Sequence, residues 1–319
     1  MGKSGVDCVR GRAAGTGALV IALALGIAGC ASGEPRGQET RRSPGVRPST
    51  PSAGPSASAA PPAVRVPAGT RAGFVVFDRA AGRVTVSRDA HGTVRSASVV
   101  KLLIAVDFLE RNRAVSARDR ALLRGMLRSS DDRAATVLWN RGGRGAIVSR
   151  TARRMGLRDT APPPASRPGY WGYTALSAAD VVEVYRYLLE RADARVRGLV
   201  LGELRRATRC GRDGFDQYFG IPRAVPRPWA VKQGWSGFGL VPSEPCGAAR
   251  GDVAGVRPVA VAAPTLGVGR PVLHTTGTVG EGDRWVVAVW TLSPPGTSFA
   301  AAASRITALT RQVHRAGTR

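Results

Sequence analysis

The sequence predicts an α+β fold in which a mostly helical lobe is inserted into an antiparallel sheet. Residues 73–78 and 83–86 are short apolar runs on either side of a glycine-containing turn, and they predict a β-hairpin. Helical patterns fill most of residues 98–189, and residues 299–314 form a terminal helical pattern. Between them lie strand-like runs at residues 228–232, 256–263, 272–278 and 284–292. Because strands occur on both sides of the helical region, the helices should form a lobe between the first and later strands, with the terminal helix flanking the sheet.

The helical region contains recognisable starts and breaks. The run from Ser98 to about Arg111 is apolar on most sides, which predicts a buried central helix. Ser116, with Asp119 three residues later, resembles a capping box and predicts the next helix. Several prolines make residues 157–172 a loop. Further helices are expected to end near residue 139, to include residues 147–155 and to cover residues 177–189.

The N-terminal segment, residues 1–29, has the pattern of a secretion signal. Lys3, Arg10 and Arg12 supply positive charge, and the apolar run that follows is too short to span a bilayer. Cys30 directly follows small residues, which resembles a bacterial lipobox. We expect cleavage before Cys30 and lipid attachment to its thiol, which would anchor the chain to the outer face of the bacterial cell membrane. The alternative is an ordinary signal peptide with an incidental cysteine.

Residues 30–66 consist mostly of Pro, Ser, Gly, Ala and Arg, and contain almost no large apolar side chains. Such a segment cannot bury enough surface to order itself, so we interpret it as a flexible tether. A disordered tail without a role would have the same composition. Residues 67–319 then remain as one large domain.

The formal net charge of the chain is +25 at pH 7. A charge this high could attract nucleic acid, but the arginines are scattered, no aromatic residues interleave a basic patch, and the leader exports the chain. Anionic lipid or cell-wall polymer is the more economical partner. We therefore expect a monomer that contacts the membrane through Cys30 and does not bind nucleic acid.

Two cysteines, Cys210 and Cys246, remain after Cys8 leaves with the leader and Cys30 is assigned to lipid. An exported chain meets conditions that permit disulfides, so we expect these two to pair. Two buried free thiols are the alternative.

Ser98 and Lys101 lie three residues apart at the start of the apolar run. On a helix, this spacing places a hydroxyl and an amine on the same face, which suits a serine nucleophile whose base is lysine. The chain has only three lysines, Lys3, Lys101 and Lys232, among its 47 basic residues. Arginine cannot release its proton in a protein whereas lysine can, so lysine at the two later positions suggests chemistry that arginine cannot perform.

Three short motifs occur in the order typical of penicillin-recognising serine enzymes. They are Ser98-Val99-Val100-Lys101, Ser130-Asp131-Asp132, and Lys232-Gln233-Gly234 at the end of a predicted strand. With Met126 before the second motif and Ala134-Ala135 after it, the chain resembles class A β-lactamases and, more broadly, the β-lactamase/DD-peptidase superfamily. The resemblance covers about residues 70–319. It implies the β-lactamase/transpeptidase-like fold and serine acyl-transfer chemistry.

The resemblance and the chemistry together suggest roles for four catalytic residues. Ser98 would attack a carbonyl, and Lys101, when neutral, could take its proton. Lys232 would supply a second cation, which lowers the proton affinity of Lys101 and attracts an anionic substrate. Ser130 would pass a proton to the departing nitrogen. By analogy with the family, the backbone N–H groups of Ser98 and Trp235 would hold the oxyanion.

The resemblance implies four substrate-binding residues: Asp132, Gln233, Gly234 and Trp235. Two of them, Asp132 and Gln233, differ from the residues that the family has at these positions. The family has Asn where this chain has Asp132, and an ionised carboxylate can accept hydrogen bonds but not donate them. A carboxylate near Lys101 would also favour its ammonium form, which is a poorer base. Gln233 stands where the family has Thr or Ser, and its amide could donate to a carboxylate over a longer reach.

A third departure concerns the release of an acyl group. Class A β-lactamases place a Glu before the position of Ser177 to activate the deacylating water, but residues 141–182 contain no Glu. An acyl-enzyme should therefore hydrolyse slowly. Residues 238–269 look inserted relative to the family.

Other candidate constellations are weak, and no cofactor or metal is expected. The three histidines, His91, His274 and His314, lack metal-type spacing. His274 could line the site beside the Lys232 strand, but a hydrogen-bonded structural role is favoured. Trp171 and Trp235 could wall the cleft or simply pack, and Asp131 should brace its turn.

Two classes of function remain open from the sequence. The first is an exported serine hydrolase acylated by β-lactams or by D-Ala-D-Ala-like wall peptides and slow to deacylate. The second is a lipoprotein that keeps the fold for penicillin binding or cell-wall binding with impaired catalysis. The motifs favour the first, whereas Asp132 and the missing Glu favour the second.

Overall fold

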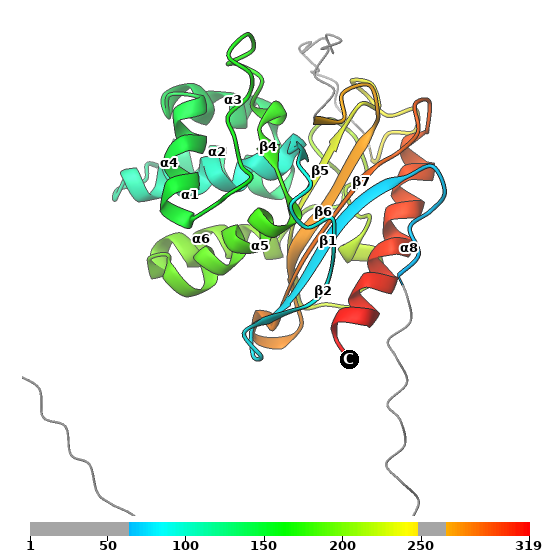
Figure 1. Ribbon diagram of the computed structural model, residues 1–319. Helices are drawn as coiled ribbons and strands as arrows, with labels where there is room; N and C mark the ends of the chain where they lie inside the picture. Colours follow the sequence, from blue (N-terminus) through cyan, green and yellow to red (C-terminus); the bar gives the residue numbers. More distant parts are fainter. Residues whose placement is uncertain (1–63, 248–265) are drawn as a thin grey trace, which may run out of the picture. The chain divides into compact units, whose positions relative to one another are not determined.

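The computed structural model describes residues 64–247 and 266–319. Its main sheet has five antiparallel strands in the order β2-β1-β7-β6-β5 (Figure 1). The strands are β1 (Arg71–Asp78), β2 (Arg83–Arg88), β5 (Trp229–Ser236), β6 (Val272–Val279) and β7 (Trp285–Leu292). Strand β1 pairs with both β2 and β7, so the first hairpin and the last strands belong to one sheet, as predicted.

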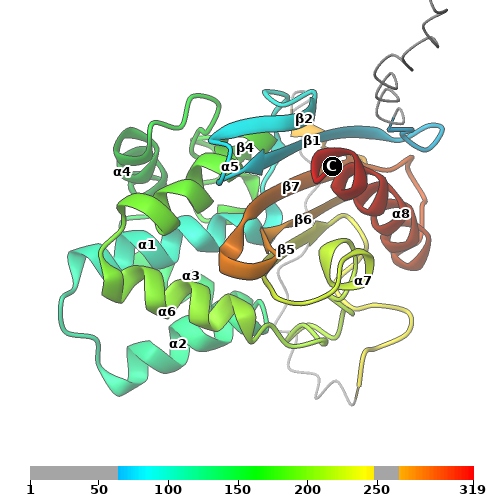
Figure 2. The same cartoon turned by 90° about the horizontal axis from the view of Figure 1, so that it is seen from below.

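A helical lobe covers one face of this sheet, and the terminal helix α8 (Phe299–Gly317) covers the other (Figures 1 and 2). The α-helices of the lobe are α1 (Lys101–Arg111), α2 (Ala117–Arg128), α3 (Asp132–Arg141), α4 (Gly145–Met155), α5 (Ala178–Arg186) and α6 (Ala194–Arg205). Shorter elements are β3 (Val94–Arg95), β4 (Ala175–Leu176), the 3₁₀ turns at Ala97–Val100, Trp171–Tyr173 and Glu281–Asp283, the π turn Tyr187–Arg191, and α7 (Ile221–Ala224). The expected insertion of a helical lobe between early and late strands is confirmed.

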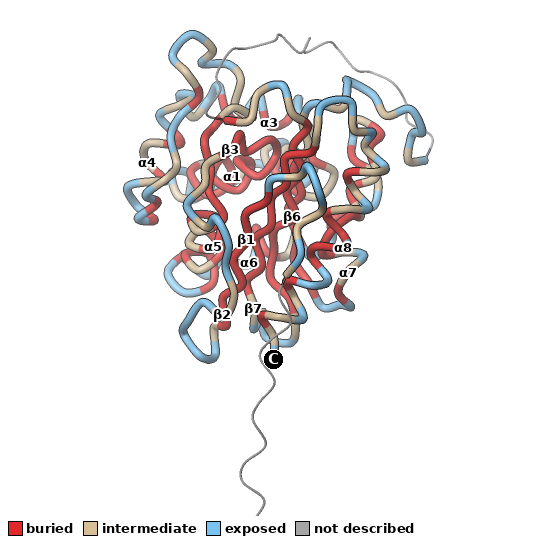
Figure 3. Tube along the Cα trace, turned by 45° about the vertical axis from the view of Figure 1, so that its right-hand side comes forward, coloured by how far each residue is buried: buried red, intermediate tan, exposed pale blue. Residues whose placement is uncertain are grey.

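Side-chain alternation on the strands divides the core into two clusters. On β1, Val75 and Phe77 face the helical lobe, whereas Phe74 and Val76 face α8. Figure 3 shows the result: the central strands are buried along nearly their whole length. Because these strands are buried on both faces, their sequences are almost continuously apolar.

Polar caps fix several helix starts. Ser116 accepts a hydrogen bond from the backbone N–H of Asp119 and begins α2, as the capping-box pattern predicts. Ser177 accepts from the N–H of Asp180 in the same way and begins α5. Asp131 accepts from two N–H groups in the first turn of α3, so its expected bracing role is confirmed.

Helix α6 is the main element that the sequence prediction missed. Asp193 caps it, and its buried residues Val196, Val200 and Leu204 recur every four positions. Both signals are present in the sequence, but the many arginines between them dilute the apolar stripe.

Packing against the sheet begins slightly before residue 67, the predicted start of the domain. Val64 and Val66 pack against the α8 side of the sheet, and the N–H of Arg65 donates to Gln312 Oε1 at 3.0 Å. The predicted signal segment, Cys30, most of the tether and the strand expected at residues 256–263 lie outside the described residues.

Candidate active site

Ser98 and Lys101 are joined by the local geometry that their spacing predicts. The backbone takes a 3₁₀ turn at Ala97–Val100 before α1 begins at Lys101. Lys101 Nζ donates to Ser98 Oγ at 2.8 Å, and both side chains are buried. Ala97 adopts a φ of 45°, a left-handed conformation that non-glycine residues rarely take and that often marks a functional site.

Ser130 reaches the same point from the turn between α2 and α3. It too has a left-handed φ, of 55°. Its Oγ lies 3.0 Å from Lys101 Nζ and 2.9 Å from Lys232 Nζ, and its carbonyl oxygen accepts from Lys101 at 2.7 Å. Ser130 is therefore a bridge between the two lysines.

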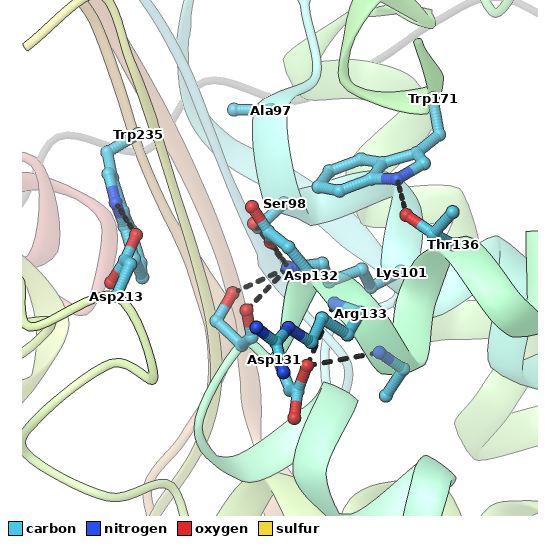
Figure 4. Close-up of polar contacts among 12 residues, drawn as sticks. Ala97, Ser98, Lys101, Asp131, Asp132, Arg133, Thr136, Trp171, Asp213 and Trp235 are labelled. Carbon is cyan, nitrogen blue, oxygen red and sulfur yellow. Dashed lines mark hydrogen bonds and ion pairs between the residues drawn. The ribbon is translucent and has the colours of Figure 1, made fainter. Parts of the chain in front are cut away.

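Asp132, the first residue of α3, forms an ion pair with Lys101. Its Oδ1 lies 2.6 Å from Lys101 Nζ (Figure 4). The lysine side chain is fully buried, whereas 56% of the Asp132 side chain is exposed, so the carboxylate lies between the lysine and solvent. The structure thus places the Asp132 carboxylate beside Lys101 Nζ, as expected from the position of the second motif.

Lys232 enters the site from the edge strand β5. Its Nζ lies 2.9 Å from Ser130 Oγ and donates to the carbonyl oxygen of Gln233 at 3.1 Å. Burial lowers the pKa of Lys232 well below its ordinary value, and the nearby charge of Lys101 lowers it further, against the opposing effects of Asp132 and Asp213.

Gly234 allows β5 to approach the nucleophile turn closely. A Cβ at this position would lie 3.1 Å from the Ser96 carbonyl oxygen and 3.3 Å from the Ser98 nitrogen. Any side chain would therefore press the strand away from Ser98. The two backbone groups expected to hold an oxyanion, the N–H groups of Ser98 and Trp235, lie on these two adjoining segments.

The Gln233 side chain does not reach the site, which corrects the prediction that its amide serves substrate binding. Successive residues of a strand point to opposite faces, so Gln233 points away when Lys232 points in. Its buried amide nitrogen donates to the carbonyl oxygens of Gln217 and Phe219, at 3.2 and 2.5 Å. The amide holds the segment before α7 against β5.

Trp235 also turns its side chain away from Ser98. Its indole N–H donates to Asp213 Oδ2 at 2.9 Å (Figure 4). Its ring packs near that of Phe215. Trp171 is the aromatic residue that covers Lys101: its ring centroid lies 4.7 Å from Lys101 Nζ, and its N–H donates to Thr136 Oγ1 at 3.2 Å.

Asp213 is a charged residue near the site that the sequence analysis missed. Burial raises its pKa, and the charge of Asp132 raises it further, while the Trp235 hydrogen bond opposes the rise. It follows Cys210, which forms a disulfide with Cys246, the pairing expected from the sequence. No local spacing links Asp213 to the motifs, because only the tertiary fold brings its loop beside β5.

Two carboxylates, Asp159 in the loop before α5 and Asp180 in the first turn of α5, are engaged in structural hydrogen bonds. Asp180 accepts from the N–H groups of Arg158 and Asp159 and from the Thr160 hydroxyl. Asp159 contacts His91 Nδ1 at 2.8 Å and accepts from Ser177 Oγ at 2.7 Å. These bonds fix the loop against α5 and engage both carboxylates.

His274 has the structural role that was favoured. It pairs with Gly234 across β5 and β6, and its Nε2 donates to the carbonyl oxygen of Arg95 at 2.9 Å. Complete burial lowers the pKa of His274 to about 4, so the ring is neutral at pH 7.

Within residues 64–247 and 266–319 the structure contains neither a cluster of metal ligands nor a membrane-spanning helix. No three His, Cys, Asp or Glu side chains gather there in a way that could hold a metal ion. None of the helices in these ranges has both the length and the apolar character needed to cross a membrane.

Comparison with solved structures identifies the architecture. A class A β-lactamase from Mycobacterium abscessus superposes with a TM-score of 0.55 at 21% identity, covering 79% of this chain and 95% of that one. A β-lactamase from Burkholderia vietnamiensis gives a TM-score of 0.57 at 16% identity, covering 79% and 92%. The chain has the class A β-lactamase fold. PBP-A has the same fold. A mutant of PBP-A was solved as an acyl-enzyme complex with penicillin G, and it matches with a TM-score of 0.55 at 16% identity, covering 78% of this chain and 90% of that one.

Sequence comparison adds a different kind of relative to this β-lactamase-like chain. Proteins of Mycobacterium tuberculosis and Mycobacterium bovis, whose name describes them as the lipoprotein LppW, are 39% identical over 175 residues. The match covers 52% of this chain and 54% of those proteins, so the chain spans about half the length of the curated relatives it matches. The sequence matches no protein-family model.

Proposed function

We propose that this β-lactamase-like chain is an exported serine hydrolase that is acylated at Ser98. The observation that carries the proposal is the continuous hydrogen-bonded path from Ser98 through Lys101 and Ser130 to Lys232. A hydroxyl in contact with a buried amine, and a second hydroxyl placed to protonate a leaving group, are the parts that acyl transfer requires. The proposed substrates are β-lactams or D-Ala-D-Ala-like wall peptides.

The proposed substrate contacts come from the backbone of β5 and from Asp132. Gly234 lets β5 lie close to the nucleophile turn, so the N–H groups of Ser98 and Trp235 lie on adjoining segments and can together stabilise the oxyanion. The exposed carboxylate of Asp132 offers acceptors only, so it suits a substrate that presents an N–H group or a cation there.

Slow deacylation is part of the proposal. Residues 141–182 contain no Glu, and the two Asp residues of that region, Asp159 in the loop and Asp180 at the start of α5, already accept hydrogen bonds from this part of the chain. Without a general base for water, an acyl-enzyme should persist far longer than one turnover of an efficient β-lactamase.

The proposed location is the outer face of the bacterial membrane, with a lipid on Cys30 as the anchor. The lipobox-like sequence before Cys30 and the lipoprotein name of the mycobacterial relatives support this location. The Pro/Ser-rich segment after Cys30 would give the domain reach toward cell-wall peptides.

The alternative is a penicillin-binding or cell-wall-binding lipoprotein with impaired catalysis. The 2.6 Å ion pair between Asp132 and Lys101 favours it, because a lysine held as an ammonium is a poor base.

Intact-mass spectrometry after incubation with a penicillin separates these functions, with Ser98→Ala as the control. A mass increase equal to the penicillin that Ser98→Ala abolishes is the expected result. Rapid loss of penicillin without an adduct would show an efficient lactamase and contradict slow deacylation. No adduct and no hydrolysis with any acyl donor would overturn the enzymatic proposal in favour of the binding protein.

A further inference from the structure

The two buried lysines of the site have different partners. Lys101 Nζ contacts four oxygen atoms: Ser98 Oγ, Ser130 Oγ, the Ser130 carbonyl and Asp132 Oδ1. The carbonyl and the carboxylate can only accept, so at least two hydrogens of Lys101 point to them. The third hydrogen of an ammonium then finds a hydroxyl oxygen. The site satisfies and neutralises a charged Lys101.

Lys232 has a poorer set of partners for a charge. Its Nζ contacts one pure acceptor, the Gln233 carbonyl at 3.1 Å, and the Ser130 hydroxyl at 2.9 Å. Among the described residues no carboxylate forms an ion pair with it, and the residue is only 1% exposed. A neutral amine fits these partners, with one hydrogen on the carbonyl and the lone pair facing the hydroxyl hydrogen of Ser130.

We propose that Lys232, rather than Lys101, is the final acceptor of the Ser98 proton, and that Lys101 and Ser130 relay the proton to it. This inference rests on the proposed acylation of Ser98 and specifies its acid–base chemistry. It reverses the roles expected from the sequence, in which Lys101 is the base and Lys232 the permanent cation. The reversal follows from Asp132, which forms its ion pair with Lys101 and not with Lys232.

The relay balances at each step. Lys101 first releases one hydrogen to Ser130 Oγ while Ser130 gives its own hydroxyl hydrogen to Lys232, which becomes an ammonium. The lone pair freed on Lys101 Nζ then accepts the Ser98 hydrogen as Ser98 Oγ bonds to the acyl carbon and the carbonyl becomes the oxyanion, whose charge the Lys232 ammonium balances. When the carbon–nitrogen bond breaks, Ser130 protonates the departing nitrogen and recovers a hydrogen from Lys232. Lys101 is an ammonium before and after the reaction.

The charged groups that face Lys232 come from three elements. Lys101 on α1 opposes a second positive charge, whereas Asp132 on α3 and Asp213, in the loop after α6, favour one. Burial is the largest influence on Lys232 and, together with Lys101, it outweighs the two carboxylates, so the pKa of Lys232 is lowered. Asp213 is itself weakened as a counter-charge, because its burial favours the protonated carboxyl.

A lysine titration by NMR tests the inference directly. The full chain contains three lysines, so labelling with ¹³Cε-lysine gives three signals, which Lys3→Arg, Lys101→Arg and Lys232→Arg assign. The pH is raised from about 6 to about 11, a range that spans the ordinary lysine value. We expect the Lys232 signal to change first, while the Lys101 signal still reports an ammonium. A Lys101 signal that changes first, or a Lys232 signal that changes only at the ordinary value, would overturn the inference.

Matched variants connect the titration to Asp132. Asp132→Asn removes the carboxylate that lies beside Lys101. It should narrow the pH interval between the titration of the Lys232 signal and that of the Lys101 signal. Asp131→Asn changes the adjacent carboxylate, whose described bonds cap α3 rather than reach either lysine, and should leave the interval unchanged. An interval unaffected by Asp132→Asn would contradict the proposed origin of the asymmetry, and circular dichroism confirms that each variant is folded.

The titration needs no acyl donor, so its failure is distinct from failure of the proposed function. A Ser98 adduct together with the wrong order of titration would overturn the relay alone. The expected order without any adduct would overturn the acylation proposal alone. In the active protein, the rate of adduct formation should rise with pH through the Lys232 transition, and Lys232→Arg should reduce it by about 10²- to 10⁴-fold, because arginine cannot accept the proton.

Discussion

Single side chains at the site combine positions that suit acylation with one that restrains it. Ser98, Lys101 and Ser130 form the arrangement expected from their motifs. Asp132 stands where class A β-lactamases have Asn, and it places a carboxylate, which only accepts hydrogen bonds, 2.6 Å from Lys101. One carboxylate thus forms the ion pair with the first lysine and, in the proposed reaction, also limits the kind of group that a substrate can present to this position.

Ser130 is expected to matter for proton transfer rather than for stability. Ser130→Ala should slow adduct formation at Ser98 by about 10²- to 10⁴-fold, because the bridge between the lysines is lost. Stopped-flow mixing with a chromogenic β-lactam measures the rate. Ser129→Ala is the matched control, since no side-chain hydrogen bond joins Ser129 to the lysines in the described structure, and it should react at the normal rate. An unchanged rate in Ser130→Ala would remove Ser130 from the mechanism.

His274 makes stability depend on pH in a defined window. Its pKa is about 4 in the folded protein and about 6.5 when unfolded, so the unfolded chain binds more protons between these values. Its contribution is complete above pH 6.5 and is lost as the pH falls toward 4, a loss of about 3 kcal/mol at 1.36 kcal/mol per pH unit.

Urea unfolding at several pH values checks this prediction. His274→Gln keeps a donor for the Arg95 carbonyl but cannot titrate, so its stability should fall less steeply with acid than that of the unmodified chain. His91→Gln changes an exposed histidine and should preserve the steep fall. Equal slopes for the His274 variant and the unmodified chain would contradict the assignment.

At the level of elements, the contact between β5 and the turn before α1 positions the site. Local sequence forms each part: an apolar run forms the strand, and the motif serine lies in the 3₁₀ turn that leads into α1. Their approach depends on Gly234, which faces the backbone of Ser96 and Ser98. The register of β5 then directs Lys232 inward and Gln233 outward.

Gly234→Ala should therefore separate β5 from the nucleophile turn. We expect a loss of about 1–3 kcal/mol in the free energy of unfolding, together with slower adduct formation. Gly198→Ala provides the comparison: Gly198 lies in α6, and an alanine Cβ there would meet no atom within 4 Å, so the change should be neutral or stabilising. Thermal unfolding measures the stability of each variant, and intact-mass kinetics measure its rate of adduct formation. An unchanged stability and an unchanged rate in Gly234→Ala would show that β5 can move away from the nucleophile turn without cost.

At the level of the whole molecule, a sheet covered on both faces carries a site at its edge. The helical lobe supplies Ser98, Lys101, Ser130 and Asp132, and the sheet supplies Lys232. The Cys210–Cys246 disulfide joins the loop of Asp213 to the segment after β5, 36 residues further along the chain. The candidate catalytic groups therefore meet only when both layers are packed.

The Cys210–Cys246 disulfide should contribute to stability. Cys210→Ser with Cys246→Ser should lower the free energy of unfolding by about 2–4 kcal/mol, mainly by enlarging the unfolded ensemble. Alkylation and mass mapping of the unmodified protein should find both thiols protected before reduction and reactive after it. Free thiols in the oxidised, exported protein would contradict the pairing.

Much of the fold was predictable because its signals are local. The first hairpin, the capped helices at Ser116 and Ser177, and the order of strands and helices follow from periodicity and capping residues. Helix α6 was missed because arginines interrupt its apolar stripe, although Asp193 marks its start. Long-range contacts, such as that between Asp213 and Trp235, leave no local pattern to detect.

The sequence alone determined the contact between Ser98 and its neighbouring lysine, because a separation of three residues at a helix start fixes it. It also supplied the order of the three motifs and the absence of Glu in residues 141–182. Tertiary structure decided which lysine Asp132 neutralises, which way Gln233 points, and that Ser130 bridges Lys101 and Lys232. These outcomes depend on strand register and on the packing of the lobe against the sheet, which bring together atoms far apart along the chain.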